Sequence, residues 1–448
     1  MTFIYQSDVP VPIEEVFAWH ERPGAFTRLL PPWQPARITQ ESDSLRDGHA
    51  TVKLPGGVTL RAQHRAEEYQ RPHRFADELV GAPLRNAVPW RHVHSFESLG
   101  ESETRIIDRV DTRVPRSMLE STFRYRHDQL AADLAAHQRS QRWLSGSVRF
   151  AMTGSSGLVG SALSAFLTTG GHSVVRLVRR PPRTRDERQW NPDDPNPRLL
   201  DGVDVVIHLA GASLAGRFTE AHRRAVRESR VAPTRRLAEV AAHASDGPHT
   251  MVTASAIGYY GPDNGDEIRT EDSDSGAGFL AGVVQDWEAA AQPAADAGLR
   301  LVQVRTGLVL TPAGGLLRLQ HPLFWTGLGG RLGHGQQWMA WVGIDDLVDI
   351  YLRAAIDESL SGAVNAVAPE PVTNAEYTRT LGRVLRRPTL LTVPMIGPRL
   401  LLGEEATEEL AAASQRVLPA RLSAAGHTFR YPGLEAALRH VLGRPARR

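Results

Sequence analysis

Three glycines at a fixed spacing are the residues of this sequence whose chemistry is easiest to recognise. Gly154, Gly157 and Gly160 form the pattern GxxGxxG between an apolar segment and a helix-like one. Such glycines permit a tight turn, close approach of a pyrophosphate to the backbone, and close helix–strand packing. Glycines in a βα turn can also serve packing alone, but here strand, turn, helix and second strand follow in register. The predicted dinucleotide-binding residues of this turn are Gly154, Ser155, Ser156, Gly157, Leu158, Val159 and Gly160.

Two arginines follow the next apolar segment. An NAD site usually has an acidic residue at this point for the ribose 2′-OH, whereas Arg179 and Arg180 suit a 2′-phosphate through charge-assisted, bidentate hydrogen bonds. The chain has a single lysine, Lys53, and arginine elsewhere, so a solvated basic loop is the alternative interpretation. The pair favours NADP(H) over NAD(H) as the cofactor.

A run of small residues follows a further apolar segment, in the sequence His208-Leu-Ala-Gly-Ala. Small side chains there let an adenosine and its ribose approach the edge of a sheet. The alternative is a βα turn that needs a glycine for its own geometry, and the two interpretations are compatible. The predicted cofactor contacts in this loop are Leu209, Ala210 and Gly211.

The elements that must position these motifs alternate between apolar strands and helical segments. The expected strands are 148–152, 173–177, 203–209, 250–254 and 301–304. This alternation predicts an α/β, Rossmann-type, doubly wound parallel sheet. We place this NADP-binding domain at residues 148–382 and expect a helical C-terminal extension at 383–443.

Residues 1–145 have a different pattern, which predicts a separate α+β domain. A strand over 2–9 precedes a helix that Pro12 opens, and an amphipathic helix runs from Phe123 to about Trp143. Further strands are expected at 50–54, 60–66, 92–96 and 104–110. A sheet gripped by a long C-terminal helix predicts a helix-grip fold.

Two segments of this domain resemble a branch of the START-like superfamily (SRPBCC, polyketide cyclase-like) that is often fused to a reductase-like domain. They are AFTRLLPPW at 25–33 and RYRHDQLAADL at 124–134. Members of that superfamily enclose hydrophobic ligands, so the resemblance implies a hydrophobic ligand for residues 1–145.

The remaining motifs resemble an atypical "epimerase family" branch of the extended short-chain dehydrogenase/reductase superfamily (NAD-dependent epimerase/dehydratase-like). They are TGSSGLVG, HLAGA, SAIGYYG (255–261), FLAGVVQDWE (279–288), RTGLVL (305–310), GQQWMAWVGIDDLV (335–348), LLGEEA (401–406) and QRVLPARL (415–422). The resemblance covers roughly 148–440 in collinear order, and implies a nicotinamide cofactor and the branch's own C-terminal extension.

The catalytic pattern of the superfamily is incomplete in this chain. Its members use a serine and a Tyr-x-x-x-Lys pair, in which the lysine lowers the pKa of the tyrosine that exchanges a proton with substrate. This chain has no lysine after Lys53 and reads GFLAGVVQ (278–285) where the pair should stand. The remaining catalytic candidates are Ser255, which could bind a carbonyl, and Tyr259, which could donate a proton. Packing is the alternative for Tyr259 and Tyr260, and Ala256 takes the place of the usual catalytic serine.

Other polar residues give weaker signals. His92 and His94 point to one face of a strand, but without a carboxylate at matched spacing we predict no metal site. Asp345 and Asp346 are expected to cap a helix that begins at Leu347. Arg305 could face the substrate or form an ion pair at the edge of the sheet. The acidic run 265–276 could be a mobile lid or solvated surface.

Composition restricts the classes of function. The 448 residues, 41% hydrophobic and 23% charged, are typical of a globular protein with more than one domain. The absence of cysteine excludes disulfides and thiolate chemistry, and a formal charge of +2 gives no indication of nucleic-acid binding. No apolar stretch is long enough for a membrane span and no signal peptide is evident, so we expect a cytoplasmic protein.

Two functions therefore remain open. The first is an NADP(H)-dependent oxidoreductase or epimerase-like enzyme of unconventional mechanism, acting on an unidentified small or nucleotide-linked substrate. The second is a non-catalytic NADP(H)-binding sensor or scaffold. The missing Tyr-x-x-x-Lys pair favours the sensor, whereas the substrate-side segments RTGLVL and GQQWMAW favour an enzyme, which we prefer.

Overall fold

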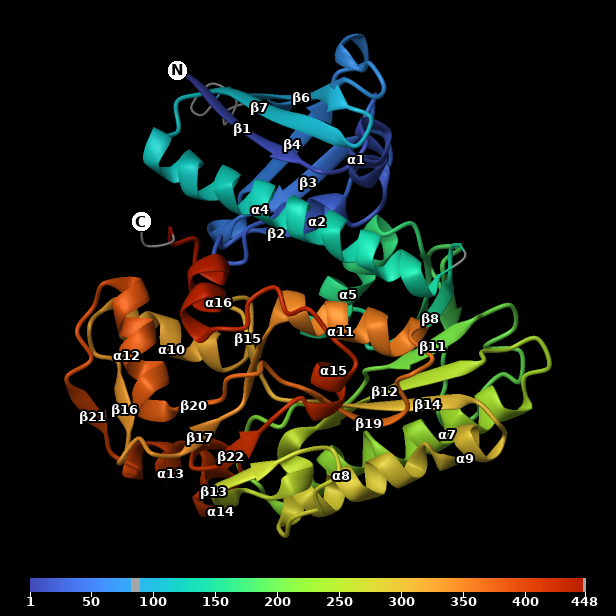
Figure 1. The fold of residues 1–448 in the computed structure, drawn as a ribbon, viewed down its shortest axis with the longest axis vertical. Coiled ribbons are helices and arrows are strands. Elements are labelled where there is room, and N and C mark those ends of the chain that lie inside the picture. The colour runs from blue at the N-terminus through green and yellow to red at the C-terminus, as the bar shows by residue number, and fades with distance from the viewer. Residues whose placement is uncertain (82–88, 145, 446–448) are drawn as a thin grey trace. The chain divides into compact units, whose positions relative to one another are not determined.

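The computed structural model describes residues 1–81, 89–144 and 146–445, which form two compact units (Figure 1). We call them the N-terminal unit (Met1–Arg142, Ser164–His172 and a segment from His440) and the Rossmann unit (Trp143–Leu163 and Ser173–Arg439). Among the described residues, no helix has the length and apolar character needed to cross a membrane.

The N-terminal unit is built on an antiparallel sheet with the strand order β1-β7-β6-β5-β4-β3-β2. Its strands are β1 (Thr2–Val9), β2 (Arg37–Gln40), β3 (His49–Lys53), β4 (Thr59–His64), β5 (Arg74–Val80), β6 (Trp90–Gly100) and β7 (Glu103–Thr112). Its helices are α1 (Ile13–Glu21), α2 (Ala25–Leu29) and the long α4 (Arg116–Ser140). The α+β architecture agrees with the expectation, although β2 and β5 were not predicted.

Helix α4 packs its apolar side chains against the sheet. Leu130 and Leu134 of α4 share a buried cluster with Phe75 and Phe96 of the sheet and Phe17 of α1. The helix follows Pro115 directly and begins seven residues before Phe123, where its apolar periodicity becomes visible in the sequence. Its first turn is largely exposed, so hydrophobic spacing gave no sign of it.

The Rossmann unit contains the predicted parallel sheet, with the strand order β10-β9-β8-β11-β12-β14-β19. The strands are β8 (Arg149–Thr153), β9 (Ser173–Val178), β10 (Glu187–Gln189), β11 (Val205–His208), β12 (Thr250–Ala256), β14 (Arg300–Thr306) and β19 (Gly362–Ala366). Its central strands are buried along nearly their whole length, because helices cover both faces of a doubly wound sheet.

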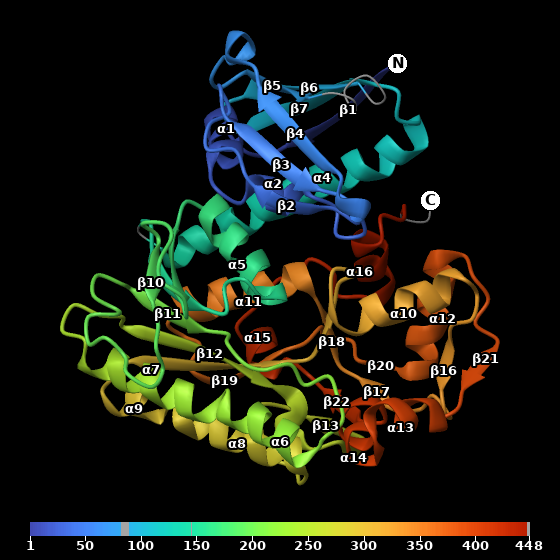
Figure 2. The same ribbon diagram turned by 180° about the vertical axis from the view of Figure 1, so that it is seen from behind.

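Helices α7 (Val231–His243), α8 (Phe279–Ala290) and α9 (Gln292–Asp296) lie on one face of this sheet (Figure 2). Leu237 and Ala241 of α7 and Ala294 of α9 pack there against Val206 and Met251. Helix α11 (Ile344–Ile356) packs on the opposite face and is buried along its entire length (Figure 1). The other helices are α5 (Leu158–Thr169), α6 (Glu220–Glu228), α10 (Gly315–Trp325) and α12 (Asn374–Leu385).

The C-terminal extension is mainly helical, but it also contains two short strands that were not predicted. It contains α13 (Ile396–Leu402), α14 (Glu404–Ala406), α15 (Ala420–Ala424) and α16 (Leu434–Val441). Strand β21 (Leu391–Val393) pairs with β16 (Gly330–Leu332), and β22 (Ser414–Val417) pairs with β13 (Asp263–Arg269). Both partners lie far away in the chain, and pairing of that kind leaves no local pattern in a three- or four-residue strand.

Candidate functional site

The sheet of the Rossmann unit reverses its winding direction between β8 and β11. The chain passes from β8 outward to β9 and β10, and then returns to place β11 on the other side of β8. Ligands of open α/β sheets bind in the crevice beyond the carboxyl ends of the strands at such a switch point. The loops that follow β8 and β11 are the two glycine-containing segments singled out in the sequence.

Contact between these two loops explains the first glycine, and crowding within the turn after β8 explains the third. Gly154 has a positive φ of 69°, and a Cβ there would lie 2.9 Å from the carbonyl carbon of Leu209 and 3.0 Å from the nitrogen of Ala210. A Cβ on Gly160 would lie 2.1 Å from the carbonyl oxygen of Gly154. Any side chain at either position would push the turn, the helix or the β11 loop out of place.

The middle glycine has a different environment. A Cβ on Gly157 would meet only the carbonyl oxygen of Gly154, at 3.2 Å, within a 4 Å radius, so its outer side is open. Helix α5 begins immediately afterwards at Leu158, with Val159 and Gly160 in its first turn. Within the described parts of the chain, the backbone N–H groups of Ser155 and Ser156 have no acceptor. Open N–H groups at the start of a helix, beside a glycine without a side chain, suit the binding of a phosphate.

Hydrogen bonds between Thr153 and the β11 loop hold the two loops together. The sequence did not lead us to predict this role for Thr153. The Oγ1 atom of Thr153 accepts the N–H groups of Leu209, at 3.1 Å, and Ala210, at 3.3 Å. It also lies 2.7 Å from Nδ1 of His208, which is fully buried, and burial lowers the pKa of His208 to about 4. A neutral His208 and Thr153 therefore fix the loop that carries Gly211. The signal available in the sequence was a threonine directly before the first glycine.

The two arginines after β9 are in different situations. Both terminal nitrogens of Arg180 donate to Glu187 on β10, at 2.8 and 2.7 Å, and Glu187 also accepts the N–H of Arg183. The side chain of Arg179 is exposed and has no ion pair or hydrogen bond with any residue that the structure describes. Arg179 is therefore the member of the pair whose guanidinium is available to an anionic ligand.

A buried network lies at the carboxyl ends of β12 and β14. The Oγ atom of Ser255 donates to Oε1 of Glu288 on α8, at 2.6 Å. Arg305 of β14 binds the same carboxylate through Nε, at 2.9 Å, and Nη2, at 2.8 Å. Burial lowers the pKa of Arg305, but the hydrogen bonds and charge of Glu288 outweigh burial and raise the pKa above its usual value. Of the two roles expected for Arg305, the structure shows the ion pair.

Two tyrosines continue this network. Tyr260 is buried, its hydroxyl donates to Oδ1 of Asn365 at 2.8 Å, and the same oxygen accepts Nη1 of Arg305 at 3.0 Å. Burial raises the pKa of Tyr260 despite the nearby guanidinium of Arg305. Tyr259 is half-buried and lies with its ring face 3.4 Å from Cζ of Arg305. The packing role expected for Tyr260 agrees with these contacts, whereas the catalytic roles of Ser255 and Tyr259 stay predictions.

Glu288 is the residue of this network that sequence reasoning missed. It lies on α8, and its side chain is 11% exposed. Glu288 is the last residue of the segment FLAGVVQDWE, which the sequence had singled out. An acidic residue near the end of a helix more often lies in solvent, so a buried role was not predicted for it.

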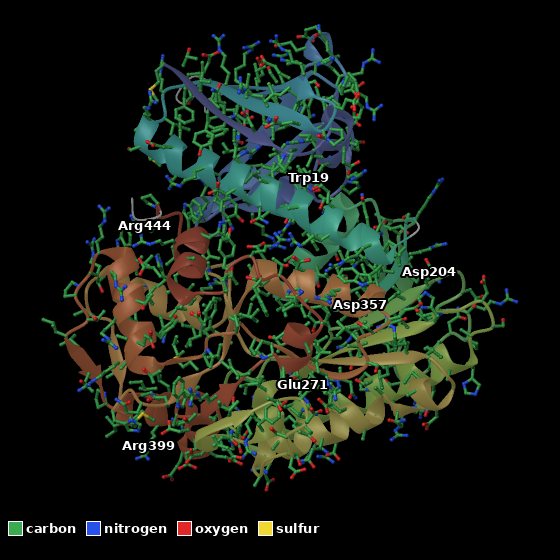
Figure 3. The ribbon with its side chains drawn as sticks, in the orientation of Figure 1. Trp19, Asp204, Glu271, Asp357, Arg399 and Arg444 are labelled. Atoms are coloured by element: carbon green, nitrogen blue, oxygen red, sulfur yellow. The ribbon has the colours of Figure 1, made fainter. Side chains whose placement is uncertain are left out.

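Two further expectations need correction. Helix α11 begins at Ile344 after Gly343, so Asp345 and Asp346 lie in its first turn and do not cap it. Asp346 instead accepts the backbone N–H groups of Arg430 and Tyr431. The acidic run 265–276 is neither a free lid nor solvated throughout, because Glu271 (labelled in Figure 3) is buried and accepts the N–H groups of Asn365 and Ala420.

The prediction of no metal site at His92 and His94 rested on sequence spacing, and the structure places two carboxylates beside these histidines. Asp77 of β5 faces His92 across the sheet, and Asp108 of β7 faces His94. Both carboxylates lie on neighbouring strands, so no fixed sequence spacing indicates them.

Comparisons with known proteins agree with this geometry. The model of the NAD dependent epimerase/dehydratase family matches residues 150–309, and that of a domain of unknown function (DUF1731) matches residues 393–441. The epimerase family protein Mb2239 of Mycobacterium bovis is 44% identical over 298 residues, which cover 66% of this chain and 98% of that protein.

Two solved structures are also similar. The nucleoside-diphosphate sugar epimerase from Corynebacterium glutamicum is 43% identical, with a TM-score of 0.87 over 98% of this chain and 90% of that one. The human epimerase family protein SDR39U1 (isoform 2), solved with NADPH, is 31% identical, with a TM-score of 0.61 over 66% of this chain and 99% of that one. The turn at the switch point and these relatives together establish that the chain belongs to the epimerase family, a branch of the NAD-dependent epimerase/dehydratase proteins.

Proposed function

We propose that this protein is an NADP(H)-dependent oxidoreductase or epimerase-like enzyme that works without the Tyr-x-x-x-Lys pair. The observation that carries the proposal is the turn after β8, where Gly157 is open and the N–H groups of Ser155 and Ser156 await an acceptor. These groups and the first turn of α5 would hold the pyrophosphate, while Leu209, Ala210 and Gly211 would lie along the adenosine half.

A preference for NADP(H) over NAD(H) is supported by Arg179. The end of β9 is where the ribose 2′ position lies in this class of fold, and the exposed guanidinium of Arg179 stands there without an acidic neighbour bound to it. Arg180 would contribute through its charge, since Glu187 already occupies its hydrogen bonds. The structure of the human relative with NADPH is consistent with this preference.

Arg179→Ala is expected to weaken NADP(H) binding by about 10- to 100-fold, since a hydrogen bond to a charged group is worth roughly 1.5–3 kcal/mol. Binding of NAD(H), which lacks the 2′-phosphate, should change little. Affinities from isothermal titration calorimetry, with melting temperatures in saturating cofactor, measure both effects. Arg185→Ala is the matched control, because Arg185 is an exposed arginine of the same loop. Equal losses of NADP(H) and NAD(H) binding in Arg179→Ala would refute the assignment of the 2′-phosphate.

Tyr259 is the candidate that would exchange a proton with substrate. When bound, the nicotinamide ring would give or take a hydride at C4, and the chain must supply or remove the accompanying proton. The guanidinium of Arg305 lies over the ring of Tyr259 and would hold that ring in place. The hydroxyl of Tyr260 cannot share this role while it bridges Asn365 and Arg305.

Tyr259→Phe is expected to reduce turnover by about 10²- to 10⁴-fold, the usual contribution of a positioned acid or base. NADPH consumption should be followed at 340 nm against a panel of small and nucleotide-linked carbonyl compounds. NADPH affinity of the variant, measured in parallel, should match that of the wild type. Turnover that survives in Tyr259→Phe would remove Tyr259 from the mechanism.

A second candidate function is a non-catalytic NADP(H)-binding sensor or scaffold. It is favoured by the hydroxyl of Ser255, which donates to Glu288 and therefore has no proton to offer a substrate carbonyl in this arrangement. A protein that binds NADPH but consumes none with any member of the panel would support the sensor over the enzyme.

For the N-terminal unit we propose a START-like domain that encloses a hydrophobic ligand. A cavity of about 630 Å³ lies within this unit and is lined largely by apolar side chains, among them Leu29, Leu45, Leu60, Phe75 and Leu79. The antiparallel sheet of this unit and its 25-residue helix α4 support the proposal. The domain boundaries that accompany the proposal remain 1–145, 148–382 and 383–443.

A further inference from the structure

Three side chains with metal-binding atoms meet on the wall of the cavity in the N-terminal unit. Asp77 lies on β5, and His92 and His94 lie on the neighbouring strand β6. Asp77 and His92 are directly opposed in the sheet, and His94 is two residues further along β6, so all three project from the same face. All three line the cavity, and both histidines are 4% exposed.

A second carboxylate, Asp108, fixes the orientation of both imidazoles. Its Oδ1 atom lies 2.9 Å from Nε2 of His92 and 2.8 Å from Nδ1 of His94. A carboxylate oxygen accepts hydrogen bonds, so Asp108 engages one nitrogen of each ring.

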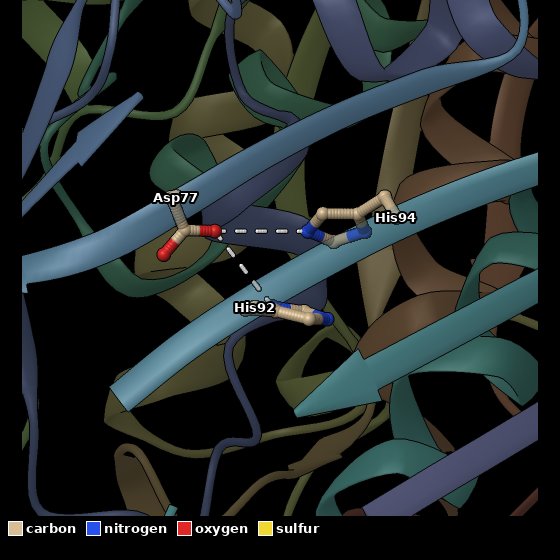
Figure 4. Close-up of side chains that lie close together, drawn as sticks. All are labelled: Asp77, His92 and His94. Atoms are coloured by element: carbon tan, nitrogen blue, oxygen red, sulfur yellow. Dashed lines mark ion pairs between the residues drawn. The ribbon is translucent and has the colours of Figure 1, made fainter. Parts of the chain in front are cut away.

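The other nitrogen of each imidazole is then directed toward Asp77. Nδ1 of His92 and Nε2 of His94 each lie 3.8 Å from Oδ2 of Asp77. Figure 4 shows the two imidazoles and the carboxylate facing one another, and one ligand atom from each residue lies within 4.8 Å of the other two. Two imidazole nitrogens and a carboxylate oxygen are thus close enough together to share a metal ion.

The surroundings match those of metal sites in proteins. Histidine ligands donate their second ring N–H to a carboxylate, which fixes the tautomer and the ring orientation. Asp108 is the carboxylate that contacts both rings. It also forms a hydrogen bond of 2.9 Å with Nε2 of His127, and Nδ1 of His127 is hydrogen-bonded to Ser7. The charge of half-buried Arg126 on the same wall opposes a cation, but Asp77 and Asp108 together outweigh it, which leaves a net charge of −1 for these three groups.

We propose that Asp77, His92 and His94 bind a divalent first-row transition-metal ion, with Zn²⁺ as the expected ion, on the wall of this cavity. Two imidazoles and one carboxylate leave one or more coordination positions open, as in sites that bind a water molecule or a substrate. Those positions would accept a carbonyl or carboxylate oxygen of an otherwise apolar ligand. The site is separate from the dinucleotide-binding turn and does not depend on the function proposed for that turn.

The test uses the full-length protein, freed of metal by dialysis against a chelator and then titrated with Zn²⁺ by calorimetry. The wild type should bind one equivalent at this site, and Asp77→Asn and His94→Asn should each weaken binding at least about tenfold. Asp108→Asn should weaken it by about 10- to 100-fold through loss of the imidazole orientation. His49→Asn is the matched control, since His49 lies on β3 of the same sheet and outside the cluster, and it should bind as the wild type does.

Spectroscopy of the wild type tests the proposal even if the variants fail to fold. X-ray absorption of the Zn²⁺-loaded protein should show two imidazole nitrogens at about 2.0–2.1 Å together with oxygen ligands. Loading with Co²⁺ should give visible ligand-field bands that one equivalent of Zn²⁺ abolishes. The proposal is overturned if the wild type binds no stoichiometric metal, if absorption shows fewer than two imidazoles, or if folded Asp77→Asn and His94→Asn bind as tightly as the wild type.

Discussion

Glu288→Ala is expected to lower the free energy of unfolding of the Rossmann unit by about 3–5 kcal/mol, because removal of one partner leaves a buried charge uncompensated. The side chains of Arg305 and Glu288 are only 5% and 11% exposed, and two hydrogen bonds join them. The substitution also leaves the hydroxyl of Ser255 without its acceptor. Urea denaturation followed by far-UV circular dichroism measures the loss.

A double substitution separates the cost of the unpaired charge from the cost of lost packing. Glu288→Leu combined with Arg305→Met should be more stable than either single variant, since apolar residues of similar volume can replace a buried ion pair at little cost. Glu239→Ala, which breaks an exposed pair with Arg236 in α7, is the control and should change the stability by less than about 1 kcal/mol. If Glu288→Ala changes the stability no more than this control does, the buried network is not the stabilising element that its geometry suggests.

Gly160→Ala is expected to abolish dinucleotide binding. The added methyl group would lie 2.1 Å from the carbonyl oxygen of Gly154, so helix α5 and the turn before it must separate. That movement displaces the N–H groups of Ser155 and Ser156, which would hold the pyrophosphate. We also expect a loss of about 1–3 kcal/mol in the free energy of unfolding from overpacking. The melting temperature with and without saturating NADP(H) reports both effects.

Gly282→Ala provides a matched control for this substitution. Gly282 lies inside α8, and a Cβ there would meet nothing within 4 Å. Alanine should stabilise that helix by roughly 0.5–1 kcal/mol, because glycine loses more conformational freedom on folding. Cofactor binding should be unaffected. An undiminished thermal shift with NADP(H) in Gly160→Ala would show that the turn tolerates a side chain and would argue against its phosphate-binding role.

Local chemistry made the Rossmann sheet and its turn predictable from the sequence. Buried parallel strands are continuous apolar runs, and glycine is required where backbones approach closely, so β8, β9, β11, β12 and β14 could be located to within a few residues. Gly160 was recognised for the same reason, since the crowding that excludes a side chain there arises within one strand–turn–helix unit, whereas the crowding at Gly154 comes from the distant β11 loop. Strand β1 was found through its alternation of apolar and polar residues, and most of helix α4 through apolar residues at helical spacing.

Contacts between residues that are distant in the sequence determined the partners of the polar side chains, which the local sequence pattern could not predict. The partner of Arg305 is Glu288 on a helix 17 positions earlier, and Asp77 reaches His92 only because β5 lies beside β6. The difference between Arg179 and Arg180 depends on Glu187, which becomes a neighbour when β10 pairs with β9. A charged side chain looks the same in a sequence whether it lies in solvent or is buried against an opposite charge. Its desolvation and its partners are set when distant elements pack, and these decide which polar groups remain available for chemistry.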